Sequence, residues 1–382
     1  MSLWSRIKSG FAASDSIIDA APPGTTPDER DTLSVIRDLS RVVRNNPDAV
    51  ETYLALGNLF RVKGDVERAV QIRESLLVRP ELASSFKARA YFELGQDYRR
   101  AGIMDRALQA YSEASRFGVP QKQINEELAG LYADAGDWQQ AAHYYSAIGN
   151  RIAEAHYMVR HGHEMLALSP EEPKRALRLF NKALKIYPAS PEAWSALIIR
   201  EAKDGKWPTA AKMLQKALDR IAPDKSFMLF EELLAQYADG NPKAASAPSV
   251  ERKKIFREFN RLCLEHFLPV IGTRNPEIGP YYYAALILQR DGRNDEAEQW
   301  INKTLVIQPE FWFGRLTQLE IARNQYGMPP IVDTDLEFFI KQSGKLKRFV
   351  CAVCGLHRDV LFYCCPRCHS WHSAGYKFTL SE

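Results

Sequence analysis

A pattern of small and large residues that recurs about every 34 residues constrains this chain more than any other feature of its sequence. In two copies an aromatic residue is followed by Leu-Gly, a second aromatic residue, a glycine and an alanine, at the same spacing. Further copies begin near residues 122, 157, 191 and 278. Small residues let paired helices approach closely, and a central glycine ends the first helix of each pair. The pattern therefore predicts stacked helix pairs, defined by Tyr53, Leu56, Gly57, Phe60, Gly64 and Ala69, and by Tyr91, Leu94, Gly95, Tyr98, Gly102 and Ala107.

This pattern resembles the tetratricopeptide repeat over most of residues 49–225 and over residues 278–310. The resemblance implies an all-α superhelix whose concave face binds peptides or proteins. Residues 225–277 keep helical periodicity without the small and large signature, so we expect a degenerate part of the array there. The predicted domains are an N-terminal tail or short amphipathic helix with a linker (1–30), the repeat array (31–325), a linker (326–345) and a C-terminal module (346–382).

The concave face of such an array is lined by fixed positions in the first helix of each repeat. In the first two copies these positions hold Glu51, Leu54, two amides, three arginines and one aromatic residue, and the amides and arginines predict a polar, positively charged groove suited to acidic segments. The alternative is that they are solvated side chains on an exposed helix face. The candidate partner-binding residues are Asn58, Arg61, Arg89, Phe92, Gln96 and Arg99.

Two Cys-x-x-Cys motifs near the C-terminus predict a metal site. Each such turn directs two sulfurs to one point, and two turns complete a tetrahedral four-sulfur site for one ion, zinc or iron. The segment 359–363 between them (DVLFY) alternates in the manner of a strand. The predicted ligands are Cys351, Cys354, Cys365 and Cys368; Cys364 is left over, and the alternative ligands are His357, His369 and His372.

Charge and composition limit the functional classes. The chain has 51 Lys and Arg residues against 47 Asp and Glu residues, which argues against a chain built wholly to bind nucleic acid. Residues 341–382 nevertheless hold seven basic and two acidic residues, so contact with nucleic acid or anionic lipid competes with simple counter-charge for thiolates. No stretch is long and apolar enough for a membrane span, and no secretory signal is evident. We find no catalytic constellation and expect a cytoplasmic, non-enzymatic protein.

The combination of repeats and a C-terminal double Cys-x-x-Cys module resembles the lipopolysaccharide assembly protein B family of Gram-negative bacteria. The segment LALGNLFRVKGDVERAV (54–70), the lead-in Arg348-Phe349 and the aromatic Trp371 carry the resemblance together with the cysteines. It implies a rubredoxin-like module that packs against the repeats and holds its metal through the four cysteines named above. It also implies an adaptor that couples a membrane-bound AAA protease to the deacetylase that commits precursors to lipid A.

The N-terminus departs from that family, whose members typically begin with a membrane-spanning helix. Here Leu3, Trp4, Ile7 and Phe11 share one face of a short predicted helix, which provides at best a weak interfacial anchor. A tail without structure is the alternative. We therefore expect protein partners at the concave face, among them a membrane protease and its client, with weak contact to the cytoplasmic face of the inner membrane. Two other functions stay open: electron transfer by iron at the four thiolates, and nucleic-acid binding by a zinc ribbon on a repeat scaffold.

Overall fold

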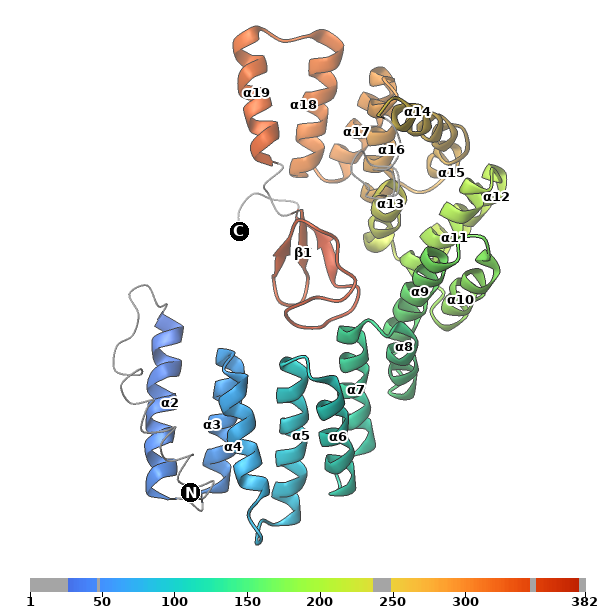
Figure 1. Ribbon diagram of the computed structural model, residues 1–382. Helices are drawn as coiled ribbons and strands as arrows, with labels where there is room; N and C mark the ends of the chain where they lie inside the picture. Colours follow the sequence, from blue (N-terminus) through green and yellow to red (C-terminus); the bar gives the residue numbers. More distant parts are fainter. Residues whose placement is uncertain (1–26, 47–48, 236–248, 344–347, 378–382) are drawn as a thin grey trace. The chain divides into compact units, whose positions relative to one another are not determined.

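The protein is an all-α array of antiparallel helix pairs followed by a small three-stranded sheet (Figure 1). The computed structural model describes residues 27–46, 49–235, 249–343 and 348–377. The chain divides into two compact units, Met1–Ile148 and Gly149–Glu382. The first unit contains α2 (Pro27–Asn45), α3 (Val50–Lys63), α4 (Val66–Leu77), α5 (Ser84–Arg100), α6 (Met104–Arg116), α7 (Gln121–Ala135) and α8 (Trp138–Ala147).

The second unit continues the helix pairs and carries the sheet. Its helices are α9 (Arg151–Leu168), α10 (Pro173–Ile186), α11 (Pro191–Lys203), α12 (Trp207–Arg220), η1 (Pro223–Lys225), α13 (Ser226–Ala235), α14 (Ser249–His266), α15 (Leu268–Gly272), α16 (Ile278–Arg290), α17 (Asn294–Ile307), α18 (Trp312–Tyr326) and α19 (Pro330–Ser343). Strands β1 (Phe349–Cys351), β2 (His357–Arg358) and β3 (Ala374–Tyr376) form an antiparallel sheet in the order β2-β1-β3.

Glycines end the first helices of several repeats, as the sequence pattern predicts. Gly64 after α3 and Gly136 after α7 adopt left-handed backbone conformations, with φ of 90° and 78°. Each donates its backbone N–H to carbonyls of the preceding turn. Because a side chain at positive φ is strained, glycine is the residue that turns the chain there into the second helix.

The small and large residues of the repeat meet across each helix pair. Gly95 on α5 faces the ring of Tyr111 on α6, and Gly162 on α9 faces Phe180 on α10. In the first repeat Gly57 faces a charged side chain instead, the guanidinium of Arg73 on α4. Arg73, Tyr111 and Phe180 are all fully buried, so the glycines make room for large side chains in the core.

Gly95→Ala is expected to lower the free energy of unfolding by about 1–3 kcal/mol, because the added methyl group overpacks the core. Its Cβ would lie 2.5 Å from Tyr111 Cε1, which belongs to a ring held by packing on both sides. Gly272→Ala is the matched control, since its nearest neighbour would be a Trp300 ring atom at an ordinary 3.7 Å. Urea denaturation of both variants measures the difference, and equal stability of the two would contradict this account.

Two sequence predictions differ from the structure in the C-terminal half. Residues 359–363 do not form the predicted strand; the second strand is the short β2 just before them, because the chain bends on leaving β2. Residues 330–343, which fall in the predicted linker, form helix α19. The degenerate part of the array contains helices α13, α14 and α15, in line with its helical periodicity. The predicted N-terminal amphipathic segment lies outside the described residues.

None of the helices in the described ranges is both long enough and apolar enough to cross a lipid bilayer.

Candidate metal centre and partner-binding face

Two turns with the same backbone hydrogen bonds bring the four predicted ligands together. In the first turn Cys351 donates its N–H to Leu356 O, and its own carbonyl accepts from Gly355, both at 2.9 Å. In the second turn Cys365 donates to Ser370 O and accepts from His369, again both at 2.9 Å. The two turns therefore have the same hydrogen bonds, offset by fourteen residues: residue 351 pairs with 356 in the first, and 365 pairs with 370 in the second.

The residue after the second cysteine of each turn has a left-handed backbone. Gly355 has φ of 70° and His369, at the equivalent position, has φ of 55°. Only glycine adopts this region without steric cost, so a histidine there reflects the demand of the turn on its backbone. The two turns are thus built by backbone geometry that the Cys-x-x-Cys spacing predicts.

The four sulfurs form a cluster whose dimensions fit a tetrahedral metal ion. All four Sγ atoms lie within 4.8 Å of one another. Cys351 and Cys368 are 3.7 Å apart, and Cys354 and Cys365 are 3.6 Å apart. Zinc–sulfur bonds of about 2.3 Å place tetrahedral sulfurs about 3.8 Å apart, which matches these separations. The site can therefore hold one ion; its ligand set suits zinc and iron alike.

Hydroxyl and amide groups around the sulfurs favour thiolates. The hydroxyl of Ser370 lies 2.9 Å from Cys368 Sγ, and this hydrogen bond, with the backbone N–H of Ser370, lowers the pKa of the Cys368 thiol. The hydroxyl of Ser373 lies 3.2 Å from Cys351 Sγ. Such outer groups orient the ligands and offset the negative charge that four thiolates bring to a divalent ion.

The spare cysteine and the histidines lie outside this cluster. Cys364 is half-buried, and burial raises the pKa of its thiol to about 11. Among the described residues, no histidine joins the group of four sulfurs. His372 instead turns toward the repeats, where it contacts Glu192. The sequence prediction of four cysteines, with neither Cys364 nor a histidine, agrees with this geometry.

Partly buried polar contacts attach the cysteine module to helix α13 and its neighbours. The guanidinium of Arg348 donates to Glu231 at 3.1 Å, and the Tyr363 hydroxyl donates to Glu232 at 2.8 Å. Lys225 donates to the carbonyl of Ala374 on β3 at 2.9 Å. The rings of Phe227 and Tyr376 pack 4.5 Å apart. The module is therefore part of the core of the second unit.

A carboxylate between two histidines makes a second attachment. Glu192 on α11 is buried and contacts His156 Nδ1 on α9 at 3.0 Å and His372 Nε2 at 3.3 Å. Burial acts to raise the pKa of Glu192, but the hydrogen bonds from the two histidines outweigh it and lower the pKa. Trp371 packs on His156, with ring centroids 5.2 Å apart. Two repeat helices and the module thus share one buried ionic group.

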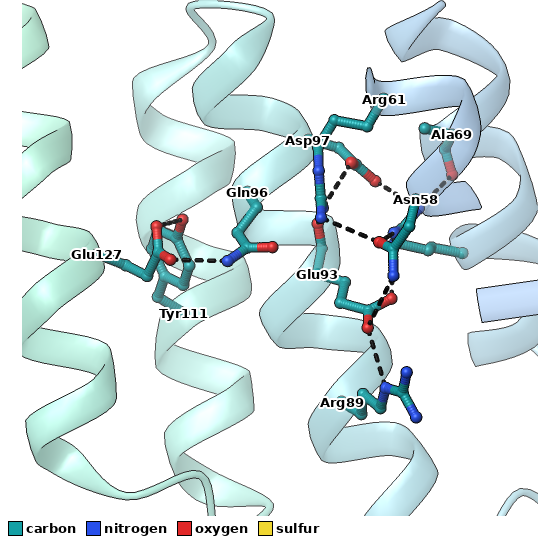
Figure 2. A network of polar contacts seen from close by, with 10 residues as sticks. Asn58, Arg61, Ala69, Arg89, Glu93, Gln96, Asp97, Tyr111 and Glu127 are labelled. Atoms are coloured by element: carbon teal, nitrogen blue, oxygen red, sulfur yellow. Dashed lines mark hydrogen bonds and ion pairs between the residues drawn. The ribbon is translucent and has the colours of Figure 1, made fainter. Parts of the chain in front are cut away.

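The predicted partner-binding residues lie on helices α3 and α5, where most of them contact acidic side chains. We refer to this part of the first unit, completed by α7, as the α3–α5–α7 face; Figure 2 shows its polar network. Arg61 donates to Asp97 at 3.1 Å, and Arg89 donates to Glu51 and Glu93 at 2.7 and 2.9 Å. The arginines therefore bind across helices as well as facing outward.

Two of the remaining predicted residues contact α7 instead. Arg99 pairs with Glu127 and Asp134 on α7, and Gln96 donates to Glu127 at 2.7 Å (Figure 2). Phe92 is half-buried beside Tyr111. Asn58 accepts from Arg61 and Arg73. The predicted polar residues thus belong to two groups of contacts, one between α3, α4 and α5 and the other between α5, α6 and α7.

Sequence reasoning missed the acidic members of these groups. Arg73, Glu93 and Asp97 are buried together, and Arg73 pairs with Asp97 at 2.8 Å and with Glu93 at 3.1 Å. One feature of the sequence indicates this burial. Arg73 lies sixteen residues after Gly57, as Tyr111 lies sixteen residues after Gly95, so Arg73 occupies the core position of the repeat. A charged residue at a core position requires a buried partner of opposite charge, which the next helix supplies.

Solved structures that resemble this one include helical repeat proteins. A tetratricopeptide repeat protein from Parabacteroides merdae is 18% identical and has a TM-score of 0.34, over 71% of this chain and 98% of that one. The complex of Naa15 and Naa10 bound to HypK-THB is 16% identical with a TM-score of 0.49, over 88% of this chain and 51% of that one. No protein-family model matches the chain.

Curated relatives match the chain over most of its length. Lipopolysaccharide assembly protein B from Haemophilus influenzae is 25% identical over 337 residues, which cover 85% of this chain and 78% of that protein. The protein of the same name from Escherichia coli strain K12 is 23% identical over 345 residues, which cover 86% and 82%. The resemblance inferred from the repeats and the cysteine motifs is thereby confirmed: the chain has curated homologues named lipopolysaccharide assembly protein B.

Proposed function

We propose that this protein is a non-enzymatic adaptor in the control of lipopolysaccharide assembly. It brings a membrane-bound protease together with the deacetylase of the lipid A pathway, the role implied by the family that it resembles. The observation that carries this proposal is the similarity to lipopolysaccharide assembly protein B over about 85% of the chain. Helix pairs stacked in an array, with polar side chains along their first helices, are a common scaffold for protein partners.

The α3–α5–α7 face is the proposed site for one protein partner. Its arginines are tied to neighbouring carboxylates, so a partner meets an ordered layer of donors and acceptors. Arg89 is 46% exposed and its partner Glu51 is 65% exposed, which leaves both accessible. Arg61 is less suitable as a test position, because its partner Asp97 is fully buried and reversal of its charge would disturb the fold.

The metal module has a structural role in this proposal. One zinc or iron ion at Cys351, Cys354, Cys365 and Cys368 would fix the two turns, and the module in turn covers α13 and holds Glu192 through His372. When bound, such an ion supplies a four-way cross-link among short segments that have little core of their own. The repeats of the second unit thereby keep one arrangement for their partners.

Affinity capture from the native organism tests both levels of the proposal. We expect the full chain to retain the protease or the deacetylase, and Arg89→Ala to reduce that capture about fivefold, as for an interface arginine worth about 1 kcal/mol. Arg116→Ala is the matched control, because Arg116 is 74% exposed on α6 and pairs only locally with Glu113.

Each outcome has a separate meaning. Capture of neither enzyme by the full chain would refute the proposed partnership. Undiminished capture by the Arg89 variant would move the binding site away from the α3–α5–α7 face. Removing residues 1–30 in a parallel experiment shows whether the N-terminal segment contributes to the capture.

A further inference from the structure

Helix α10 carries a row of cations along its exposed face. Between Pro173 and Ile186 the helix has five basic residues and no acidic residue, and all five are exposed. At 3.6 residues per turn they fall within a strip about 100° wide and about 16 Å long. The opposite face is buried through Ala176, Phe180 and Ala183. The row consists of Lys174, Arg175, Arg178, Lys182 and Lys185.

Helix α12, the second helix of the next repeat, carries a parallel row. Lys212, Lys216 and Arg220 are four residues apart and exposed, so they lie on one side of the helix. The single exposed carboxylate of α12, Asp219, is paired with Arg274 at 2.5 Å. Within the part of the chain that the structure describes, none of the eight cations on the two helices forms an ion pair.

An open groove of about 610 Å³ lies between the C-terminal ends of α10 and α12. Its walls come from the end of α10 and the following turn (Leu184, Pro188), from Trp194 on α11, and from Lys216, Asp219 and Arg220 on α12. Trp194 donates its indole N–H to the carbonyl of Pro188 at 2.9 Å, which fixes the ring as one wall. The groove therefore joins apolar side chains of α10, the following turn and α11 to two cations of α12, and its carboxylate, Asp219, is paired with Arg274.

We propose that this basic surface, formed by the cationic rows of α10 and α12 and the groove between them, docks an acidic protein segment that carries an apolar side chain. Carboxylates would pair with the two rows, and the apolar side chain would fill the groove beside Leu184 and Trp194. The charge is complementary, and the groove supplies the apolar contact that fixes the position of such a segment.

The surroundings favour a protein segment over the other anionic surfaces. The large apolar side chains of α10 and α12 are buried or half-buried, so neither helix offers the exposed apolar face that inserts into a membrane. A flat bilayer surface also does not enter a groove. A nucleic-acid backbone would use the cations but leave Leu184 and Pro188 without an apolar partner.

This surface goes beyond the proposed function, because it lies in the second unit and uses none of the residues of the α3–α5–α7 face. An adaptor needs two docking sites that can be filled at once. The basic surface and the α3–α5–α7 face would provide two sites with different chemistry: the cations of the first form no ion pair among the described residues, whereas the arginines of the second are paired with carboxylates of the chain.

The test measures binding of a fluorescent peptide that repeats Glu-Glu-Leu-Glu three times to the full chain by anisotropy at low salt. We expect binding that weakens as salt is added, and about a tenfold loss in Lys182→Glu/Lys216→Glu. A Gln-Gln-Leu-Gln peptide of the same length should bind at least tenfold more weakly than the acidic one. The control variant is Lys63→Glu/Lys122→Glu, which reverses two exposed lysines of the first unit and should bind like the wild type.

Three results would overturn the proposal. The first is equal binding of the acidic and neutral peptides, and the second is equal binding by the two reversal variants when circular dichroism shows both folded. The third is no peptide binding by a chain that binds phosphatidylglycerol vesicles or duplex DNA through Lys182 and Lys216. Peptide binding does not involve the protease or deacetylase, so failure of their capture leaves this result unaffected.

Discussion

Cys351→Ser is expected to lose the metal: the ion-to-protein ratio of the purified chain should fall from one to near zero. Cys351 is a buried member of the four-sulfur cluster whose sulfur lies 3.7 Å from Cys368 Sγ, and a serine hydroxyl does not replace a thiolate for zinc or iron at neutral pH. Loss of one of four ligands from a closed site should weaken metal binding by at least about 100-fold. Mass spectrometry of the metal content measures the ratio.

The matched control for that variant is Cys364→Ser, one residue from a ligand but outside the sulfur cluster. It should keep a full complement of metal. The Cys351 variant should also exchange amide hydrogens faster at β1 and β3, because these strands depend on the turn that Cys351 begins. Full metal content in Cys351→Ser, or equal loss in both variants, would refute the ligand assignment.

Arg73→Leu is expected to lower the free energy of unfolding by about 3–5 kcal/mol, because it leaves buried carboxylates without their cation. Arg73 has no exposed surface and pairs with both Asp97 and Glu93. Arg68→Ala is the control, since Arg68 forms a half-exposed pair with Asp65, three residues away, that should be worth at most about 1 kcal/mol. Denaturant unfolding at pH 7 compares the two, and similar losses would contradict a buried network.

The same network predicts how the loss depends on pH. Burial raises the pKa of Asp97 from 3.8 to about 6, although Arg73 and Arg61 oppose that rise. Removing Arg73 raises the pKa further, so the folded variant holds a proton that the unfolded chain releases. Its stability therefore increases as the pH falls from 7 toward 4, and the gap to the wild type should narrow. A gap that stays constant on acidification would assign the loss to packing alone, and a gap that widens would contradict this account.

The repeat and the clustering of the four cysteines could be predicted because both depend on spacing within short segments. The sixteen residues from Gly95 to Tyr111 place a gap and the side chain that fills it on facing helices. The two Cys-x-x-Cys turns are set by backbone hydrogen bonds within six residues. In each case the structure depends on the spacing of residues that are close in the chain, and this spacing can be seen in a single sequence.

Contacts between repeats could not be predicted in the same way. The pairing of Arg61 with Asp97, or of Glu192 with His372, depends on which helices stack against each other. It also depends on the conformations that the long side chains adopt. Helix α19 escaped prediction for a different reason. The consecutive prolines at 329 and 330 resemble a break in the chain, whereas Pro330 is the first residue of the helix, a position where proline's missing N–H costs nothing.

Arg73 has a consequence for the order of the repeats. Arg73 on α4 forms salt bridges with Glu93 and Asp97 on α5. The next first helix, α7, aligns Glu127 with Glu93 but Leu131 with Asp97. If α4 packed against α7 instead of α5, the buried guanidinium of Arg73 would face Leu131 in place of Asp97. The positive charge of Arg73 therefore disfavours arrangements in which α4 packs against the wrong first helix.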